Sequence, residues 1–249
     1  MSASEADPAA DLDPWEQHAG WWQDGFTDGA DPEYTEQIVP MAAARLAGAH
    51  RVLDIGTGEG QLARLAADLG AQVVGVDPSA AQLATARVRA GGPSYARAGA
   101  GALPVATASC DVVLACLVFE HIDPFEPALA EVARVLAPGG RFLWFLNHPL
   151  LQTPGSGWID DHILDEQYWR IGRYLVEDVA MEEVAPGVLL PFVHRPLSRY
   201  VNALRDHGLV LDRMEEPAPP PGFLARAHEY GQAASIPRLL YLEASAPLR

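Results

Sequence analysis

A glycine-punctuated stretch at residues 52–60, VLDIGTGEG, constrains the fold of this chain more than any other segment. In it an apolar run is followed by glycine at three alternate positions, Gly56, Gly58 and Gly60. Glycine permits positive φ and, because it lacks a Cβ, lets a ligand approach the backbone closely. Residues 61–69 then place leucine and alanine at helical spacing. A strand, a glycine turn and a helix form the first half of a nucleotide-binding βαβ unit.

The glycine pattern narrows the choice of nucleotide. A dinucleotide fingerprint is G-x-G-x-x-G, whereas this loop is G-x-G-x-G and has Gln61 where the last glycine of the fingerprint would stand. A second apolar strand ends in Asp77, and an acid at that position can accept both ribose hydroxyls of a bound nucleotide. The loop and the acid together predict an adenosine ligand. They leave open whether it is a nicotinamide dinucleotide or an adenosyl compound.

The charge balance excludes several classes of partner. The chain has 249 residues and a formal net charge of −16, and its 17 basic residues are all arginine. This balance repels phosphate backbones and anionic lipid surfaces, so we expect no nucleic-acid and no membrane partner, and the lack of lysine excludes a catalytic lysine. The absence of a signal-peptide pattern and of a long apolar run, together with only two cysteines, predicts a cytoplasmic protein.

Strand and helix periods alternate from residue 51 to residue 147, which is typical of an α/β fold with a parallel sheet and helices on both faces. Strands are expected at 51–55, 72–76, 94–97, 111–115 and 141–147, and helices at 59–69, 79–89 and 124–137. Later elements are expected as a helix at 197–207 and strands at 209–214 and 237–244. The last two strands have no helical crossover between them, so we expect them to pair antiparallel.

The flanking segments differ from this core in composition. Residues 1–13 are small and acidic, and we expect them to be disordered. Residues 14–249 are interpreted as one domain with a core at 50–147, an inserted lid at 148–193 and a C-terminal part at 194–249.

Five regions of the chain carry a recognisable pattern in order and spacing. They are VLDIGTGEG at 52–60, GVDPS at 75–79, ALP at 102–104 with CDVV at 110–113, LVFEHI at 117–122 and LAPGGRF at 136–142. A weaker match, HRPLS, lies at 194–198. Together these regions resemble the class I S-adenosylmethionine (SAM)-dependent methyltransferases. The resemblance implies a Rossmann-like, seven-stranded, mostly parallel sheet with an antiparallel last strand and helices on both faces.

The same resemblance implies SAM as cofactor, with S-adenosylhomocysteine (SAH) as product. It assigns Asp54 to the ammonium side of SAM, Gly56 and Gly58 to its methionine part, and Asp77 to its ribose. It further assigns cofactor contacts to Thr57, Pro78, Ala98, Gly99, Ala100 and Leu117. The family often has an acid at the position of Gly99 that contacts the adenine amine. Here that contact is either missing or made by the backbone of the two neighbouring alanines.

Two histidines are expected at the carboxyl ends of neighbouring strands, where an open α/β sheet binds its ligand. His121 follows the fourth strand and His148 follows the fifth. Imidazole suits proton abstraction near neutral pH, so either is a candidate general base. Each also has a structural interpretation, as a helix cap for His121 and as a turn residue for His148. We favour His121 because the loop after strand four passes closest to the methyl group in the proteins that this chain resembles.

Most tryptophans lie outside the alternating core, which favours a role in an apolar substrate pocket or in attaching the lid to the sheet. The predicted substrate contacts are Trp22, Phe26, His148, Trp158, Trp169 and His194. No metal site is expected, because the pair Glu120–His121 lacks further ligands nearby in the sequence.

The sequence thus predicts a SAM-dependent methyltransferase that modifies oxygen or nitrogen of a small, partly apolar metabolite, as a monomer or a homodimer. Two alternatives remain open at this point. One is a SAM- or SAH-binding regulatory protein without catalysis, and the other is a nicotinamide-dependent oxidoreductase.

Overall fold

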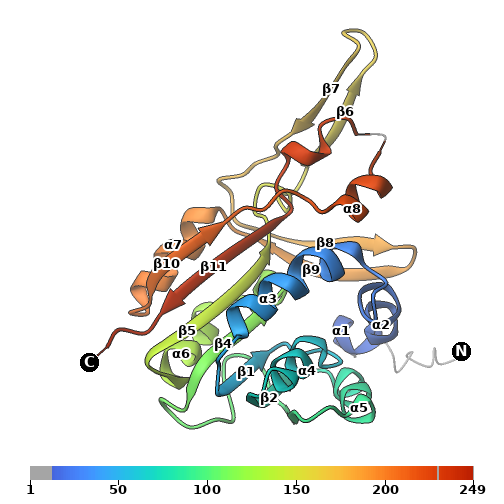
Figure 1. The fold of residues 1–249 in the computed structure, drawn as a ribbon. Coiled ribbons are helices and arrows are strands. Elements are labelled where there is room, and N and C mark those ends of the chain that lie inside the picture. Colours follow the sequence, from blue (N-terminus) through green and yellow to red (C-terminus); the bar gives the residue numbers. More distant parts are fainter. Residues whose placement is uncertain (1–12, 229, 249) are drawn as a thin grey trace, which may run out of the picture.

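A central sheet of seven strands organises the computed structural model, which describes residues 13–228 and 230–248 (Figure 1). Its order is β10-β11-β5-β4-β1-β2-β3. The strands are β1 Arg51–Ile55, β2 Gln72–Asp77, β3 Ser94–Arg97, β4 Cys110–Cys116, β5 Leu136–Asn147, β10 Val210–Glu215 and β11 Leu239–Ser245. Strand β11 runs antiparallel to both of its neighbours, while the pairs among β1 to β5 are parallel. The predicted fold class, including the reversed last strand, is confirmed.

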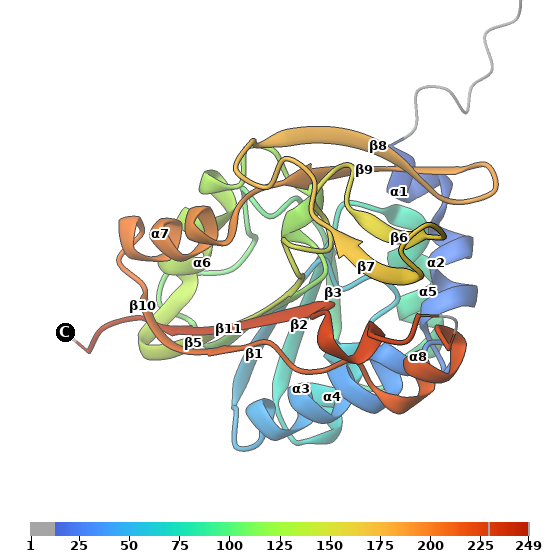
Figure 2. The same ribbon diagram turned by 90° about the horizontal axis from the view of Figure 1, so that it is seen from above.

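Helices cover both faces of this sheet, as the view from above shows (Figure 2). They are α3 Val39–Leu46, which continues a π-helical turn at Tyr34–Ile38, α4 Gln61–Asp68, α5 Ala80–Arg89, α6 Glu126–Val135 and α7 Leu197–Asp206. Strand β5 is buried on both sides, because Phe142 and Trp144 pack with α6 and α7 whereas Leu143 and Phe145 pack with α3 and α4. A parallel strand that is covered on both faces is expected to be a continuous run of apolar residues, as residues 142–146 are.

The segment predicted as a lid, 148–193, forms two antiparallel β-hairpins. One consists of β6 Gly157–Asp161 and β7 Glu166–Arg170, and it projects away from the sheet in Figure 1. The other consists of β8 Asp178–Ala185 and β9 Val188–His194, and it lies beside the N-terminal helices. Those are α1 Pro14–Gln17 and α2 Ala19–Phe26. The predicted disordered tail lies, except for residue 13, outside the described residues.

Short elements complete the chain. They are the 3₁₀ turn Phe119–His121 after β4, the helix α8 Pro221–Arg226 and the 3₁₀ turn Ala233–Ser235. Within the described residues, no helix is both long enough and apolar enough to cross a membrane.

Gly75, in the middle of β2, shows how closely the glycine loop is packed on the sheet. A Cβ at this position would lie 2.7 Å from Thr57 Oγ1 and 2.8 Å from Tyr95 Cδ1, on the two neighbouring segments. We therefore expect Gly75→Ala to lower the free energy of unfolding by about 1–3 kcal/mol, as overpacking of a core does. Urea denaturation measures the change.

Gly20→Ala is the matched control for this substitution. A Cβ at Gly20, inside α2, meets no atom within 4 Å, so this variant should equal the parent or gain up to about 1 kcal/mol. Equal stability of the two variants would contradict the packing argument.

Candidate active site

The carboxyl ends of β1, β2 and β4 border a cavity of about 450 Å³. Every residue predicted to contact the cofactor lines it: Asp54, Gly56, Thr57, Gly58, Asp77, Pro78, Ala98, Gly99, Ala100 and Leu117. We call this space the cofactor cavity. Its position agrees with the general rule that open α/β sheets bind ligands beyond the carboxyl ends of their strands.

Gly56 allows the glycine loop to pack closely against the loop after β4. Gly56 has a φ of +66°, and a Cβ there would lie 2.3 Å from Cγ2 of Val118 on the loop after β4. Only glycine adopts this conformation without strain and leaves room for the neighbouring loop. The loop therefore lies directly against the segment that carries His121.

Two carboxylates face the cavity from the ends of β1 and β2. Asp54 Oδ2 accepts a hydrogen bond from Thr57 Oγ1 at 2.7 Å, and Asp77 accepts from the backbone N–H groups of Gly58 at 2.9 Å and Ser79 at 2.8 Å. Loss of hydration on burial raises the pKa of Asp54 to about 7 and that of Asp77 to about 6. A cationic ligand would restore both groups to full ionisation.

The N-terminal helices and the residues next to them form one side of the cofactor cavity. Asp13, Trp15, Trp22 and Thr27 belong to its lining. Glu16 Oε2 accepts hydrogen bonds from Ser79 Oγ at 2.6 Å and from the N–H of Ala81, so α1 is fixed to the beginning of α5.

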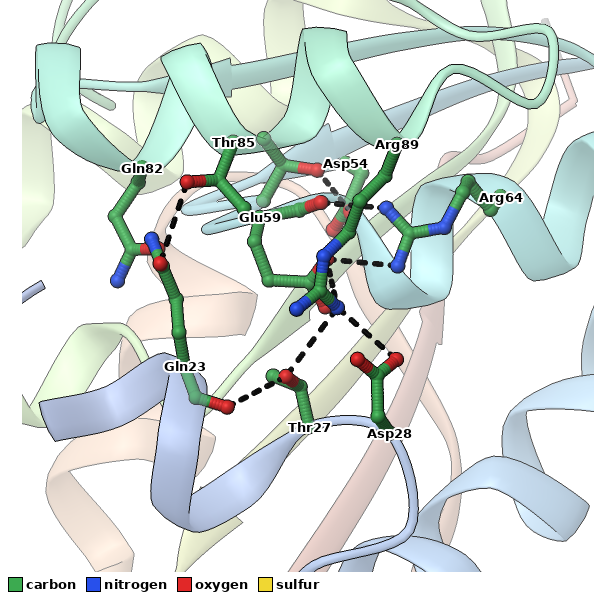
Figure 3. Close-up of polar contacts among 10 residues, drawn as sticks. Gln23, Thr27, Asp28, Asp54, Glu59, Arg64, Gln82, Thr85 and Arg89 are labelled. Atoms are coloured by element: carbon green, nitrogen blue, oxygen red, sulfur yellow. Dashed lines mark hydrogen bonds and ion pairs between the residues drawn. The ribbon is translucent and has the colours of Figure 1, made fainter. Parts of the chain in front are cut away.

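A second set of contacts ties α2 to α5 (Figure 3). Gln23 donates to Gln82 Oε1 at 2.9 Å and accepts from Thr85 Oγ1 at 3.2 Å. Arg89 Nη1 lies 3.0 Å from Asp28 Oδ1 and donates to Thr27 Oγ1 at 3.3 Å. The whole segment 13–28 is thereby held against the nucleotide-binding half of the sheet.

Arg89 also reaches the glycine loop through Glu59. The Glu59 side chain is buried, and its Oε2 lies 2.8 Å from Arg89 Nη1 and 2.7 Å from Arg64 Nη2. A buried carboxylate without a cation is costly, so these two arginines stabilise the loop in this conformation. The glycine loop, α5 and the N-terminal segment are thus joined by one network of polar contacts.

A second cavity of about 270 Å³ adjoins the first. Five residues line both cavities, and we call them the shared wall: Trp15, Trp22, Tyr34, Leu117 and His121. The second cavity is bounded further by Trp21, Phe26, Phe192 and Leu190, with polar groups from the π-helical turn, β5, β8 and the chain before β11. Its aromatic lining is suited to a small organic molecule.

His121 stands in the shared wall with a defined tautomer. Its Nδ1 lies 2.7 Å from the carbonyl oxygen of Pro191, and since a carbonyl only accepts, Nδ1 carries the proton. The ring lies between Trp15 at 4.7 Å and Phe192 at 4.5 Å, centroid to centroid. Burial lowers the pKa of His121 to about 4, so the neutral imidazole offers the lone pair of Nε2 at neutral pH.

Arg195 and Glu120 fix the loop that carries this histidine. The buried Arg195 donates to the carbonyl oxygens of Phe119 and Ile122, the latter at 2.7 Å. Glu120 accepts from the backbone and side-chain nitrogens of Asn147, each at 3.0 Å, which connects the loop to the end of β5. Such contacts hold the side chain of His121 in one orientation.

The other two predicted histidines line neither cavity. Both ring nitrogens of His148 are engaged, Nε2 at 2.7 Å from Glu216 Oε1 and Nδ1 accepting from the N–H of Leu150. His194 lies at the end of β9 with Nε2 at 2.8 Å from the carbonyl oxygen of Tyr174. The contacts of His148 fit its structural interpretation as a turn residue, and those of His194 connect the end of β9 to the chain at Tyr174.

The predicted substrate aromatics fall into two groups. Trp22 lines both cavities and Phe26 lines the second, and the two rings stack with centroids 4.4 Å apart. Trp158 and Trp169 instead pair with each other across β6 and β7, and Trp158 stacks on Tyr230 at 5.1 Å. They line neither cavity, because the first hairpin projects away from the sheet (Figure 1).

Sequence reasoning missed several lining residues, among them Tyr34, Gln82 and Cys116. Tyr34 belongs to the shared wall, and its hydroxyl lies 3.6 Å from Cys116 Sγ at the end of β4. Burial raises the pKa of Tyr34 well above its usual value, so the phenol stays neutral. No motif marks Tyr34, because it comes from a π-helical turn that only the tertiary fold brings to this place.

Known methyltransferases are similar to this chain in sequence and in fold. The family model described as a methyltransferase domain matches residues 53–144. A solved SAM-dependent methyltransferase from Mesorhizobium loti is 28% identical, with a TM-score of 0.72 over 83% of this chain and 96% of that one. Residues 53–144 form a domain of the methyltransferase family. The resemblance stated from its motifs is thereby confirmed.

Curated methyltransferases match the central part of the chain. An O-methyltransferase named resE, from Aspergillus sclerotiorum, is 37% identical over 134 residues, which is 50% of each protein. A demethylmenaquinone methyltransferase from Thermus thermophilus is 36% identical over 121 residues, 46% of this chain and 54% of that protein. The chain thus matches about half the length of these curated relatives.

The buried carboxylates at the ends of β1 and β2 predict a pH-dependent stability. Because the pKa of Asp54 is higher in the folded than in the unfolded protein, its ionisation opposes folding as pH rises from about 4 through about 7. Asp54→Asn removes this effect, so the free energy of unfolding of the ligand-free variant relative to the parent should increase between pH 5 and pH 7.5.

Chemical denaturation at several pH values measures this difference, with the exposed Asp68→Asn as control. The control should keep a constant offset from the parent. A constant offset for Asp54→Asn as well would show that this carboxyl is not destabilised by burial.

Proposed function

We propose that the protein transfers the methyl group of SAM to an oxygen or nitrogen atom of a small, partly apolar metabolite. The observation that carries the proposal is the shared wall, since it brings a neutral histidine between a cofactor cavity and an aromatic cavity. The relatives named O-methyltransferases support oxygen as the target atom.

The lining of the cofactor cavity fits SAM. The carboxylates of Asp54 and Asp77 suit its ammonium and its ribose hydroxyls, and the N–H groups of the glycine loop suit polar groups of its methionine part. Gln61 Oε1 is buried in this lining without a hydrogen-bond partner among the described residues, so it is available to the ligand. When bound, SAM supplies an electrophilic methyl group on a sulfonium sulfur.

The residues of the shared wall then account for the chemistry. The acceptor lies in the second cavity, where the tryptophans exclude water and orient it toward the cofactor. Nε2 of His121 takes the proton that the acceptor oxygen or nitrogen loses as it bonds to the methyl carbon. The carbonyl of Pro191 stabilises the imidazolium that forms, through the N–H at Nδ1.

Asp77→Ala tests the placement of the cofactor. The variant loses the acceptor for two ribose hydroxyls, and hydrogen bonds to charged groups contribute about 1.5–3 kcal/mol each, so SAM should bind at least tenfold more weakly. Calorimetric titration with SAM measures the affinity. The exposed Asp68→Ala serves as control, and an unchanged dissociation constant for Asp77→Ala would refute the placement.

His121→Ala tests the general base. The catalytic rate should fall by about 10²–10⁴-fold while the dissociation constant for SAM stays within a few-fold of the parent value. Transfer of radiolabelled methyl from SAM to an extract of small metabolites measures the rate. His162→Ala, at the tip of the β6–β7 hairpin, is the control and should match the parent.

The pH profile gives an independent readout of the same residue. An unperturbed histidine would lose activity below its usual pKa of about 6.5. Because burial lowers the pKa of His121 to about 4, the parent should keep its rate down to about pH 5.

The alternative function is a regulatory protein that binds SAM without catalysis. Tight binding of SAM without any methyl transfer to the extract would favour this alternative.

A further inference from the structure

Among the residues that the structure describes, the carboxylate of Glu182 in the second cavity has no cationic partner. From this we infer that the acceptor of the proposed methyl transfer carries a protonated amine, bound by Glu182, on a small aromatic or apolar body. The inference rests on the proposed function, because it takes the second cavity as the acceptor site.

Charges in the lining of this cavity are mostly negative. Its carboxylates are Asp31, Glu33 and Glu182, and the only arginine among its lining residues is Arg238. Arg238 is neutralised, since its Nε lies 2.7 Å from Glu33 Oε1 and its guanidinium carbon lies 4.1 Å from the ring centroid of Phe223. A carboxylate or phosphate on the acceptor would find no free cation in this lining.

Glu182 differs from the other two acids in its partners. Asp31 Oδ1 accepts from the backbone N–H of Tyr34 at 3.0 Å, and Glu33 has its arginine. Glu182 accepts one hydrogen bond, from Gln152 Nε2 at 3.1 Å, and among the described residues no ion pair is formed with it. Partial burial raises its pKa, which shows that the carboxylate is poorly compensated in this position.

The surroundings of Glu182 favour an ammonium group over other cations. It shares the inner side of the β8–β9 hairpin with Leu190, its cross-strand neighbour, and with Phe192. Trp15, Trp21 and Trp22 line the same cavity, and the first two pack against Leu190 and Phe192. Aromatic faces attract ammonium groups, and a carboxylate beside them completes a site for a small organic cation.

The volume of the cavity sets the size of the acceptor. About 270 Å³ accommodates a one-ring or two-ring molecule rather than a macrocycle or a peptide. His121 and Glu182 both line it, so the methylated atom and the amine would be separate groups of one molecule, or the amine itself would be the target.

Matched fragments test the inference directly on the full-length protein loaded with SAH. The probes are 2-phenylethylammonium and 3-phenylpropionate, which have similar size and opposite charge. Quenching of tryptophan fluorescence reports their binding, because three tryptophans line the cavity. We expect the ammonium probe to bind at least tenfold more tightly than the carboxylate probe.

The variants identify the group responsible. Glu182→Gln should weaken binding of the ammonium probe about tenfold and leave the affinity for SAH unchanged. Glu183→Gln is the matched control, because that neighbouring side chain is exposed and lines neither cavity, and it should keep the preference of the parent.

Three results would overturn the inference: equal or tighter binding of 3-phenylpropionate, no binding of the ammonium probe at millimolar concentration, or full retention of ammonium affinity in Glu182→Gln. Each of these presupposes that SAH binds. Failure of SAH to bind in the calorimeter would refute the proposed function itself, so the two failures are distinguishable.

Discussion

The ion pairs of the buried Glu59 are the interaction on which the candidate site depends. Removal of one partner from a buried ion pair costs about 3–5 kcal/mol, because the remaining charge stays in a poorly hydrated place. Arg64 and Arg89 supply the positive charge, and Arg89 extends to Asp28 on the N-terminal segment. The conformation of the glycine loop is thereby coupled to the position of a segment that ends about thirty residues earlier (Figure 3).

This coupling explains why two adjoining cavities, and not one open cleft, lie at the carboxyl ends of the strands. Because the N-terminal helices are bound to α5, Trp15 and Trp22 lie between the glycine loop and the β8–β9 hairpin. Val188, Leu190 and Phe192 of that hairpin pack on Trp15 and Trp21. The shared wall thus depends on three segments distant in sequence, whereas the cofactor cavity alone depends mainly on the sheet.

The same distinction, between local segments and contacts of distant segments, separates what could be predicted from the sequence from what could not. Strand β1, the glycine loop and Asp77 follow local rules of period and turn chemistry, so the first parallel strands and the glycine turn are readable from residues 51–117. The other predicted cofactor contacts follow from the resemblance of these motifs to a known family. Trp158 and Trp169 illustrate the limit: aromatic content outside the core does not tell which of two hairpins folds over the cavity. Tyr34 and Glu182 carry no motif, and only tertiary contacts bring them to the second cavity.

A crystal structure of the protein with SAH tests the central claim most directly, namely that methyl transfer occurs across the shared wall. The account predicts that the ribose hydroxyls lie on Asp77 and that the sulfur faces the opening bounded by Trp22, Tyr34 and His121. A sulfur atom directed away from the second cavity, or SAH bound outside the cofactor cavity, would contradict the account.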